Sequence, residues 1–171
     1  MRNGTRFLLL HKTENGKIMT ELEYKDLLKT AWKQTEFSYA PYSGFRVGAA
    51  LLAENGSIYS GSNVENASYP AGTCAERTAF FRAVSEGQKK FRAIAIVGGK
   101  ALENGEIEVR DYCYPCGICR QVMAEFCSFD NFEVILCYSK KMEKENIKVF
   151  KLKELLPFAF AKNQIQNKIL P

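Results

Sequence analysis

The first clear pattern along the chain is an apolar stripe with helical spacing that follows Thr20. Apolar side chains recur three and four residues apart through this segment, at Tyr24, Leu27, Leu28, Ala31 and Trp32. Thr20 and Glu23 have the spacing of a capping box, in which a hydroxyl and a carboxylate cap the first helical turn. The pattern therefore predicts a first helix that begins after Thr20 and ends near Phe37.

The rest of the chain alternates between strand-like and helix-like patterns. A largely apolar run at residues 45–52 predicts a strand, and Asn55-Gly56 predicts a tight hairpin into a second strand at residues 57–62. Further along, the pattern predicts a helix at 74–85, a strand at 93–97, a loop at 98–114, a helix after Pro115, strands at 132–138 and 147–150, and a short segment at 152–156. This alternation indicates an α/β fold in which helices cover a sheet.

The length and charge of the chain narrow its class. With 171 residues it is long enough for one domain with a core of its own. Residues 1–19 lack periodicity, so we predict a leader at 1–19 and a single catalytic domain at 20–171. The net charge of +5 comes from lysines interleaved with acids, which is weak evidence for nucleic-acid binding. No stretch approaches the roughly 20 apolar residues of a membrane span.

Six cysteines need an explanation, and their spacing favours a metal site over disulfides. Cys74 opens one helical segment, with Thr73 as its expected N-cap, and Cys116 and Cys119 lie one turn apart at the start of another. Because a helix N-terminus lowers the pKa of nearby thiols, we expect all three cysteines to favour the thiolate that binds zinc. Free thiols are typical of a reducing, cytoplasmic compartment.

The residues around these cysteines indicate a catalytic site. Three thiolates leave the fourth position of a tetrahedral Zn²⁺ open for water. Glu76 follows Cys74 by two residues, so its carboxylate is placed to take a proton from that water and pass it to a substrate. Three cysteines, a carboxylate that is not a ligand and a Pro-Cys-x-x-Cys motif are typical of zinc-dependent nucleobase deaminases. The single histidine, His11, is far from both stretches in the sequence.

A polar stretch before the first cysteine is a candidate sugar-binding segment. In an extended chain, Asn63 and Glu65 face the same side. They would present an amide and a carboxylate to sugar hydroxyls, although a solvated loop has the same composition.

Several motifs together resemble the small homotetrameric cytidine deaminases, over residues 24–160. The resemblance rests on stretches in a shared order and at similar spacing: Ala40-Pro41-Tyr42-Ser43 with Phe45-Arg46-Val47-Gly48-Ala49-Ala50, Asn63-Val64-Glu65-Asn66-Ala67-Ser68-Tyr69-Pro70, Cys74-Ala75-Glu76-Arg77-Thr78-Ala79, Pro115-Cys116-Gly117-Ile118-Cys119-Arg120-Gln121-Val122 and Glu154-Leu155-Leu156-Pro157. The family implies a three-layer α/β/α sandwich with a central mixed sheet of about five strands. It also implies hydrolytic deamination of cytidine and deoxycytidine to uridine and deoxyuridine with release of ammonia, a reaction of pyrimidine salvage.

The resemblance assigns a role to each matching position. Cys74, Cys116 and Cys119 would hold Zn²⁺. Glu76 would shuttle protons, and Arg77 would donate hydrogen bonds to a ligand sulfur. The nucleoside would be bound by residues from several subunits of a homotetramer: Phe45 against the pyrimidine, Asn63 and Glu65 on the ribose 3′-hydroxyl, the Ala75 backbone on the base carbonyl, and Ala67, Tyr69 and Phe160 from neighbouring subunits.

Three features depart from the family pattern. Ser62 stands where many members have cysteine, and we expect this change to be neutral. The segment 99–114 is longer than usual and would alter access to the site. Cys113 forms a second Cys-x-x-Cys frame with Cys116, so a fourth thiolate that closes the metal site is an alternative.

Other functions share parts of the pattern. A structural zinc module would have no need of Glu76. A polynucleotide-editing deaminase needs basic and aromatic surface to hold a strand, and mostly uses histidine as its first ligand. A deaminase of a cytosine-containing drug such as blasticidin shares the chemistry, but the stretch from Asn63 to Asn66 favours a nucleoside sugar. A nucleotide substrate would need a phosphate-binding cluster that the sequence does not reveal.

Overall fold

The computed structural model describes residues 19–162 and residue 164. The elements along this part of the chain are α1 (Glu21–Gln34), β1 (Phe45–Ala53), β2 (Ile58–Ser62), α2 (Ala75–Ser85), β3 (Phe91–Ala101), β4 (Ile107–Glu108), α3 (Gly117–Phe126), β5 (Glu133–Cys137), β6 (Ile147–Lys151) and α4 (Leu152–Leu155), with short 3-10 helices at Thr35–Phe37, Tyr69–Ala71 and Lys144–Asn146. Within the described residues, no helix combines the length and the apolar character that a membrane crossing requires.

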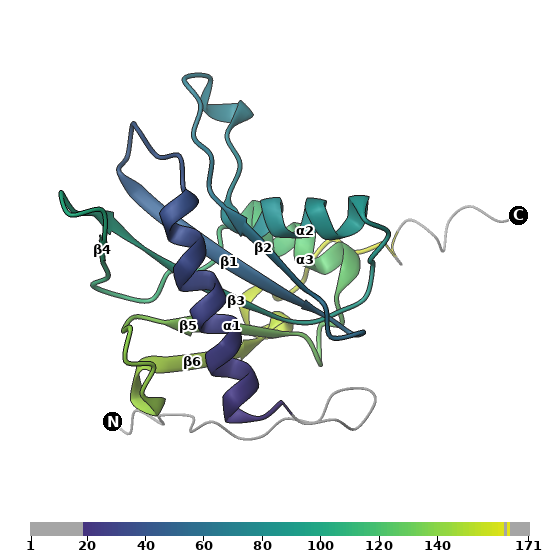
Figure 1. Ribbon diagram of the computed structural model, residues 1–171. Coiled ribbons are helices and arrows are strands. Elements are labelled where there is room, and N and C mark those ends of the chain that lie inside the picture. The colour runs from purple at the N-terminus through teal and green to yellow at the C-terminus, as the bar shows by residue number, and fades with distance from the viewer. Residues whose placement is uncertain (1–18, 163, 165–171) are drawn as a thin grey trace, which may run out of the picture.

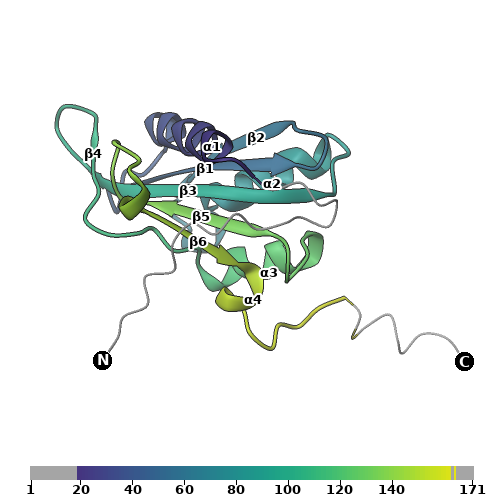
Figure 2. The ribbon, with the colours of Figure 1, turned by 90° about the horizontal axis from the view of Figure 1, so that it is seen from below.

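The molecule has three layers, with helices on both faces of a mixed sheet (Figures 1 and 2). The strand order is β2-β1-β3-β5-β6, and the short β4 pairs with the far end of β3. The predicted α/β/α sandwich with about five strands is therefore confirmed. The predicted leader stays a prediction, because residues 1–18 lie outside the described residues. Met19, the last residue of that leader, is buried in the core beneath α1.

The helix α1 covers one face of the sheet and buries the predicted stripe. Its capping box is formed as predicted, because Thr20 Oγ1 accepts from the Glu23 N–H at 3.2 Å and Glu23 Oε2 accepts from the Thr20 N–H at 2.8 Å. The α-helix stops at Gln34 and not at Phe37. The Thr35 hydroxyl donates to the carbonyl of Trp32 at 2.8 Å, and the chain tightens into a 3-10 turn.

The strand β3 runs four residues further than predicted, and part of the expected loop is a hairpin. Residues 98–101 continue the strand, and Lys100 and Ala101 pair with β4. Gly99 allows this pairing, since a Cβ at that position would lie 2.4 Å from the carbonyl oxygen of Glu108. The prediction of a long loop over 98–114 was therefore wrong for its first half.

The helices α2 and α3 cover the opposite face of the sheet (Figure 2). Cys74, and not Thr73, is the N-cap of α2, with extended backbone angles. Thr73 lies one residue outside the helix, where its N–H and carbonyl pair with Val64 at 2.9 Å each. Those two bonds hold Thr73 in an isolated β-bridge, so the predicted N-cap was wrong by one residue. Gly87 follows the end of the helix, with a φ of +87° that suits glycine.

The topology brings the N-termini of α2 and α3 to one edge of the sheet. The strand β1 is antiparallel to both β2 and β3, and β3 is parallel to β5, so β2, β3 and β5 run in one direction. The helix α2 follows the carboxyl end of β2, and α3 follows the short β4, which pairs with the carboxyl end of β3. Both helices therefore begin at the same sheet edge, where α/β proteins commonly bind their ligands.

Candidate metal centre and substrate pocket

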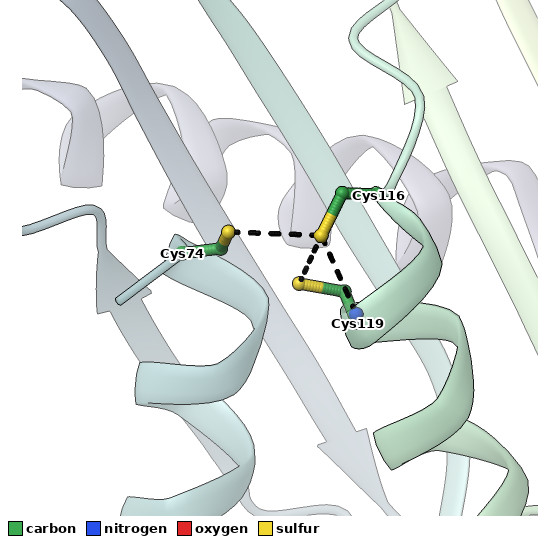
Figure 3. Close-up of side chains that lie close together, drawn as sticks. All are labelled: Cys74, Cys116 and Cys119. Carbon is green, nitrogen blue, oxygen red and sulfur yellow. Dashed lines mark hydrogen bonds between the residues drawn. The ribbon is translucent and has the colours of Figure 1, made fainter. Parts of the chain in front are cut away.

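Three cysteine thiols meet between the N-termini of α2 and α3 (Figure 3). Cys74 is the N-cap of α2, Cys116 is the N-cap of α3, and Cys119 lies in the first turn of α3. The sulfur of Cys116 is 3.8 Å from that of Cys74 and 3.5 Å from that of Cys119. All three sulfurs lie within 4.8 Å of one another, and within the described residues they form the one such group that can hold a metal ion.

The spacing of these sulfurs fits zinc. Two sulfurs on one tetrahedral Zn²⁺, each about 2.3 Å from the metal, lie about 3.8 Å apart. The metal-binding group does not include Cys113, so the alternative of a fourth thiolate finds no support in the geometry. The Cys113 sulfur instead packs over β3, where a Cβ on Gly98 would lie 2.7 Å from it. Three thiols and an open fourth position are the arrangement of a catalytic zinc site.

The pKa values of two of the thiols, Cys74 and Cys119, are shifted in opposite directions. The Cys119 thiol donates to the Cys74 sulfur and, together with Arg77, lowers the pKa of Cys74 to about 5. The same contact and burial raise the pKa of Cys119 above its ordinary value. The lowered pKa that was expected is found for Cys74, whereas the pKa of Cys119 is raised and the expectation is wrong there. Metal binding removes the remaining protons, since only thiolates are ligands.

Arg77 lies beside the first of these sulfurs. Its Nη2 donates to the carbonyl of Gly72 at 3.1 Å and reaches the Cys74 sulfur at 4.0 Å. Three thiolates on Zn²⁺ carry a net negative charge, and a guanidinium next to one of them offsets part of it. This is the position that the sequence analysis expected for Arg77.

Glu76 is buried in the first turn of α2, with 4 % of its surface exposed. Burial, to which the charge of Cys74 adds, raises the pKa of its carboxyl to about 7. A carboxyl group with that pKa both accepts and donates a proton near neutral pH. Glu76 also lines the pocket described next, so its carboxyl is placed for proton transfer to a bound molecule.

A pocket of about 600 Å³ opens beside the metal-binding thiols. Most of the sequence-predicted site residues line it, namely Phe45, Asn63, Glu65, Tyr69, Cys74, Glu76, Arg77 and Cys116. The volume is within the range of small-ligand sites. The structure therefore brings candidate catalytic, metal-binding and sugar-binding residues to one concave surface.

Asn63 and Glu65 both line the pocket, where Asn63 binds the start of β1 and Glu65 binds the loop that contains Tyr42 and Ser43. Asn63 Oδ1 accepts from the Val47 N–H at 2.7 Å. Glu65 Oε2 accepts from the N–H groups of Tyr42 at 2.9 Å and Ser43 at 3.1 Å, and Oε1 accepts from the Ser43 hydroxyl. These bonds lower the pKa of Glu65, with the Ser43 hydroxyl as the largest cause. The carboxylate is thus charged and fixed in direction.

Three predicted substrate residues lie outside the lining of this pocket. Ala75 is completely buried at the start of α2, where no side chain caps the free N–H groups of the helix. Ala67 is exposed in the loop before α2. Phe160 is 62 % exposed, and its carbonyl accepts from Gln121 Nε2 at 2.7 Å. The last two side chains point outward from the single chain.

Several residues that line the pocket were not predicted as site residues. Tyr42 and Ser43 were given no role in the site, and Tyr114 was expected only within the loop at 98–114. The signal for the turn was present, because residues 40–43 are part of a motif that carries the resemblance. The signal for Tyr114 was its place two residues before Cys116.

Comparison with known proteins supports one family. The sequence model of one protein family, described as the cytidine and deoxycytidylate deaminase zinc-binding region, matches residues 22–134 of this chain. A cytidine deaminase of Sporosarcina psychrophila is 44 % identical, over 84 % of this chain and 96 % of its own length. A crystal structure of cytidine deaminase from Burkholderia pseudomallei matches with a TM-score of 0.69 and 40 % identity, over 83 % of this chain and all of that chain. A blasticidin-S deaminase of Bacillus cereus is 32 % identical, over 68 % of this chain and 78 % of its own length.

Proposed function

Because the chain belongs to the cytidine deaminase family, we propose that it catalyses the zinc-dependent hydrolytic deamination of cytidine and deoxycytidine. The products are uridine or deoxyuridine and ammonia. The observation that carries this proposal is the buried Glu76 carboxyl beside three convergent thiols, at the wall of a pocket large enough for a nucleoside.

The thiols of Cys74, Cys116 and Cys119 would hold the zinc ion. When bound there, zinc would lower the pKa of a water molecule and so supply the nucleophile at neutral pH. The carboxylate of Glu76 accepts a proton from the attacking water and delivers it to ring N3, which makes C4 more electrophilic. Once the water oxygen is bonded to C4, Glu76 takes the remaining proton from the new C4 hydroxyl and transfers it to the amine. The C4–N4 bond then breaks, the amine leaves as ammonia and the C4 carbonyl of the product forms. A pKa of about 7 suits both transfers.

The remaining lining residues would orient the nucleoside. The Phe45 ring is half-exposed in the pocket and offers a surface for the pyrimidine. The fixed carboxylate of Glu65 and the amide of Asn63 would bind the ribose 3′-hydroxyl. The uncapped N-terminus of α2 at Ala75 would donate to the base carbonyl. Both cytidine and deoxycytidine carry the 3′-hydroxyl, so this arrangement accepts both.

The assembly that we propose is a homotetramer in which neighbouring subunits complete each site. Ala67 and Tyr69 would approach a neighbour's ribose, and Phe160 would cover a neighbour's base. The exposure of Tyr69 at 80 % and of Phe160 at 62 % supports this, because large aromatic side chains on one chain favour burial in an interface. The six free thiols suit a reducing cytoplasm, where the reaction would serve pyrimidine salvage.

The test is a loss of ultraviolet absorbance when zinc-loaded protein is mixed with cytidine. We expect rapid conversion by the wild type. Glu76→Gln should keep one zinc per chain and lose at least about a hundredfold in kcat, the lower range for general acid–base groups. The matched control is Glu103→Gln, an exposed glutamate in the turn between β3 and β4. A zinc-loaded wild type that leaves cytidine unchanged would reject the assignment, and blasticidin and single-stranded polynucleotide would then be tried as substrates.

A further inference from the structure

The extended part of β3 contacts the loop at the sugar side of the pocket. Lys100, which pairs with Phe45 across β1 and β3, donates from Nζ to the carbonyl of Ser43 at 2.5 Å. Its side chain lies against Gly44, where a Cβ would be 3.3 Å from Nζ and 3.5 Å from Cε. The N–H of Ala101 donates to the carbonyl of Gly44 at 2.7 Å. Two successive residues of β3 therefore hold this loop.

The same loop holds the carboxylate assigned to sugar binding. Ser43 donates from its hydroxyl to Glu65 Oε1 and from its N–H to Glu65 Oε2. The Ser43 hydroxyl oxygen also accepts from the N–H of Phe45 at 2.9 Å. Ser43 thus stands between Lys100, which binds its carbonyl, and two pocket residues, which its hydroxyl contacts.

We propose that Lys100 is a positioning residue for sugar recognition, which acts by fixing Ser43 and through it the Glu65 carboxylate. This inference rests on the proposed function, because it takes the 3′-hydroxyl as the partner of Glu65. Lys100 itself lies outside the pocket lining. It lies instead in the lining of a neighbouring cavity of about 550 Å³ that shares Phe45 with the pocket.

The hairpin that contains Lys100 is attached at other points as well. Arg46 Nη1 donates to the carbonyl of Gly105 at 3.1 Å, and Lys140 Nζ pairs with Glu106 Oε1 at 2.5 Å. These contacts hold the hairpin turn against β1 and against the turn after β5. The segment 99–114, which the sequence analysis expected to alter access to the site, therefore supports the pocket wall from outside.

The variant that tests this role is Lys100→Met, which keeps the aliphatic stem over Gly44 and removes the donor and the charge. Lys100→Arg restores a cationic donor at the same place. Lys140→Met is the matched control, because it removes another lysine that anchors the same hairpin but contacts no pocket residue. For each protein, kcat and KM are measured with cytidine and with 3′-deoxycytidine, which lacks the hydroxyl in question.

We expect Lys100→Met to raise KM for cytidine about fivefold and to leave kcat unchanged. A fivefold change corresponds to the free energy of about one net hydrogen bond. Its KM for 3′-deoxycytidine should stay within about twofold of the wild type, because no hydroxyl is left to lose. Lys100→Arg and Lys140→Met should resemble the wild type. Dissociation constants of uridine and 3′-deoxyuridine, measured by calorimetry, give the same comparison without turnover.

An unchanged KM for cytidine in Lys100→Met would overturn the inference. So would an equal rise for both nucleosides, or a fall in kcat alone, because neither acts through the 3′-hydroxyl. A wild type that fails to convert cytidine would instead reject the proposed function, and this outcome is read from the wild type before any variant is compared.

Discussion

Gly61 of β2 lies directly against the backbone of α2, and this contact sets where Cys74 lies. A Cβ on Gly61 would be 2.5 Å from both the carbonyl oxygen of Ala75 and the N–H nitrogen of Ala79. Ordinary contact begins at 3.4 Å, so Gly61→Ala requires the helix backbone to move outward by about 0.9 Å. Helix backbone is a rigid neighbour that cannot rotate away as a flexible side chain does.

That displacement exceeds what a zinc site tolerates. Metal–ligand distances in a proper site agree with their ideal values to about 0.2 Å. Cys74 is the N-cap of the displaced helix, whereas Cys116 and Cys119 belong to α3. We therefore expect Gly61→Ala to weaken zinc affinity by about tenfold or more, since misplacing one ligand of three acts directly on binding. Overpacking should also lower the free energy of unfolding by about 1 to 3 kcal/mol.

The assay is a competition titration of zinc against a chromophoric chelator, beside thermal unfolding followed by circular dichroism. The matched control is Gly117→Ala at the start of α3, where an added Cβ meets no atom within 4 Å and the backbone angles suit alanine. The control should bind zinc as the wild type does. If Gly61→Ala equals the wild type in both zinc affinity and melting temperature, the argument that Gly61 sets the position of the metal ligand is refuted.

Other changes test further parts of the structure. Cys113→Ser should keep one zinc per chain by elemental analysis, and a loss of metal would restore the fourth-ligand alternative. Tyr24→Phe removes a buried 2.7 Å hydrogen bond to Glu133, whose carboxylate keeps Lys151 as a partner. Urea unfolding should show that the free energy of unfolding falls by about 1.5 to 3 kcal/mol. An unchanged free energy of unfolding would mean that Lys151 alone satisfies the carboxylate. Phe80→Ala should lower the free energy of unfolding by about 3 to 5 kcal/mol, because the Phe80 ring is completely buried. A decrease below about 1 kcal/mol would contradict the packing of Phe80 in the core. Zinc chelation should lower the melting temperature and zinc addition should restore it; a melting temperature indifferent to metal would contradict a site formed between two helices.

The metal centre was predictable because its signals are local. Cys116 and Cys119 are one helical turn apart, and Cys74 and Glu76 lie at the start of another helix, so residue type and spacing alone indicate the chemistry. The apolar stripes of α1 and the run of β1 are local signals too, and both elements were found. Small errors fell at element ends, as at Thr73, where a two-bond bridge to Val64 decides the backbone angles.

The parts that were missed depend on contacts between distant segments. The extension of β3 requires Gly99 to admit the Glu108 carbonyl, and neither residue alone signals a strand. Lys100 reads as an ordinary surface lysine in the sequence, and only the pairing of β1 with β3 places it over Ser43. The direction of the Glu65 carboxylate likewise comes from a turn more than twenty residues earlier.

The convergence of the metal ligands follows from the direction of the strands. Cys74 and Cys116 are 42 residues apart, and no local rule brings them together. They meet because β2, β3 and β5 are parallel to one another, and each connection passes through a helix on the same face of the sheet. Right-handed crossovers that advance across a sheet in one direction place their helices on one face. A metal held between the two helix N-termini therefore links two helices that also pack on each other through Phe80 and Phe126, so its affinity depends on how closely each helix packs on its strands.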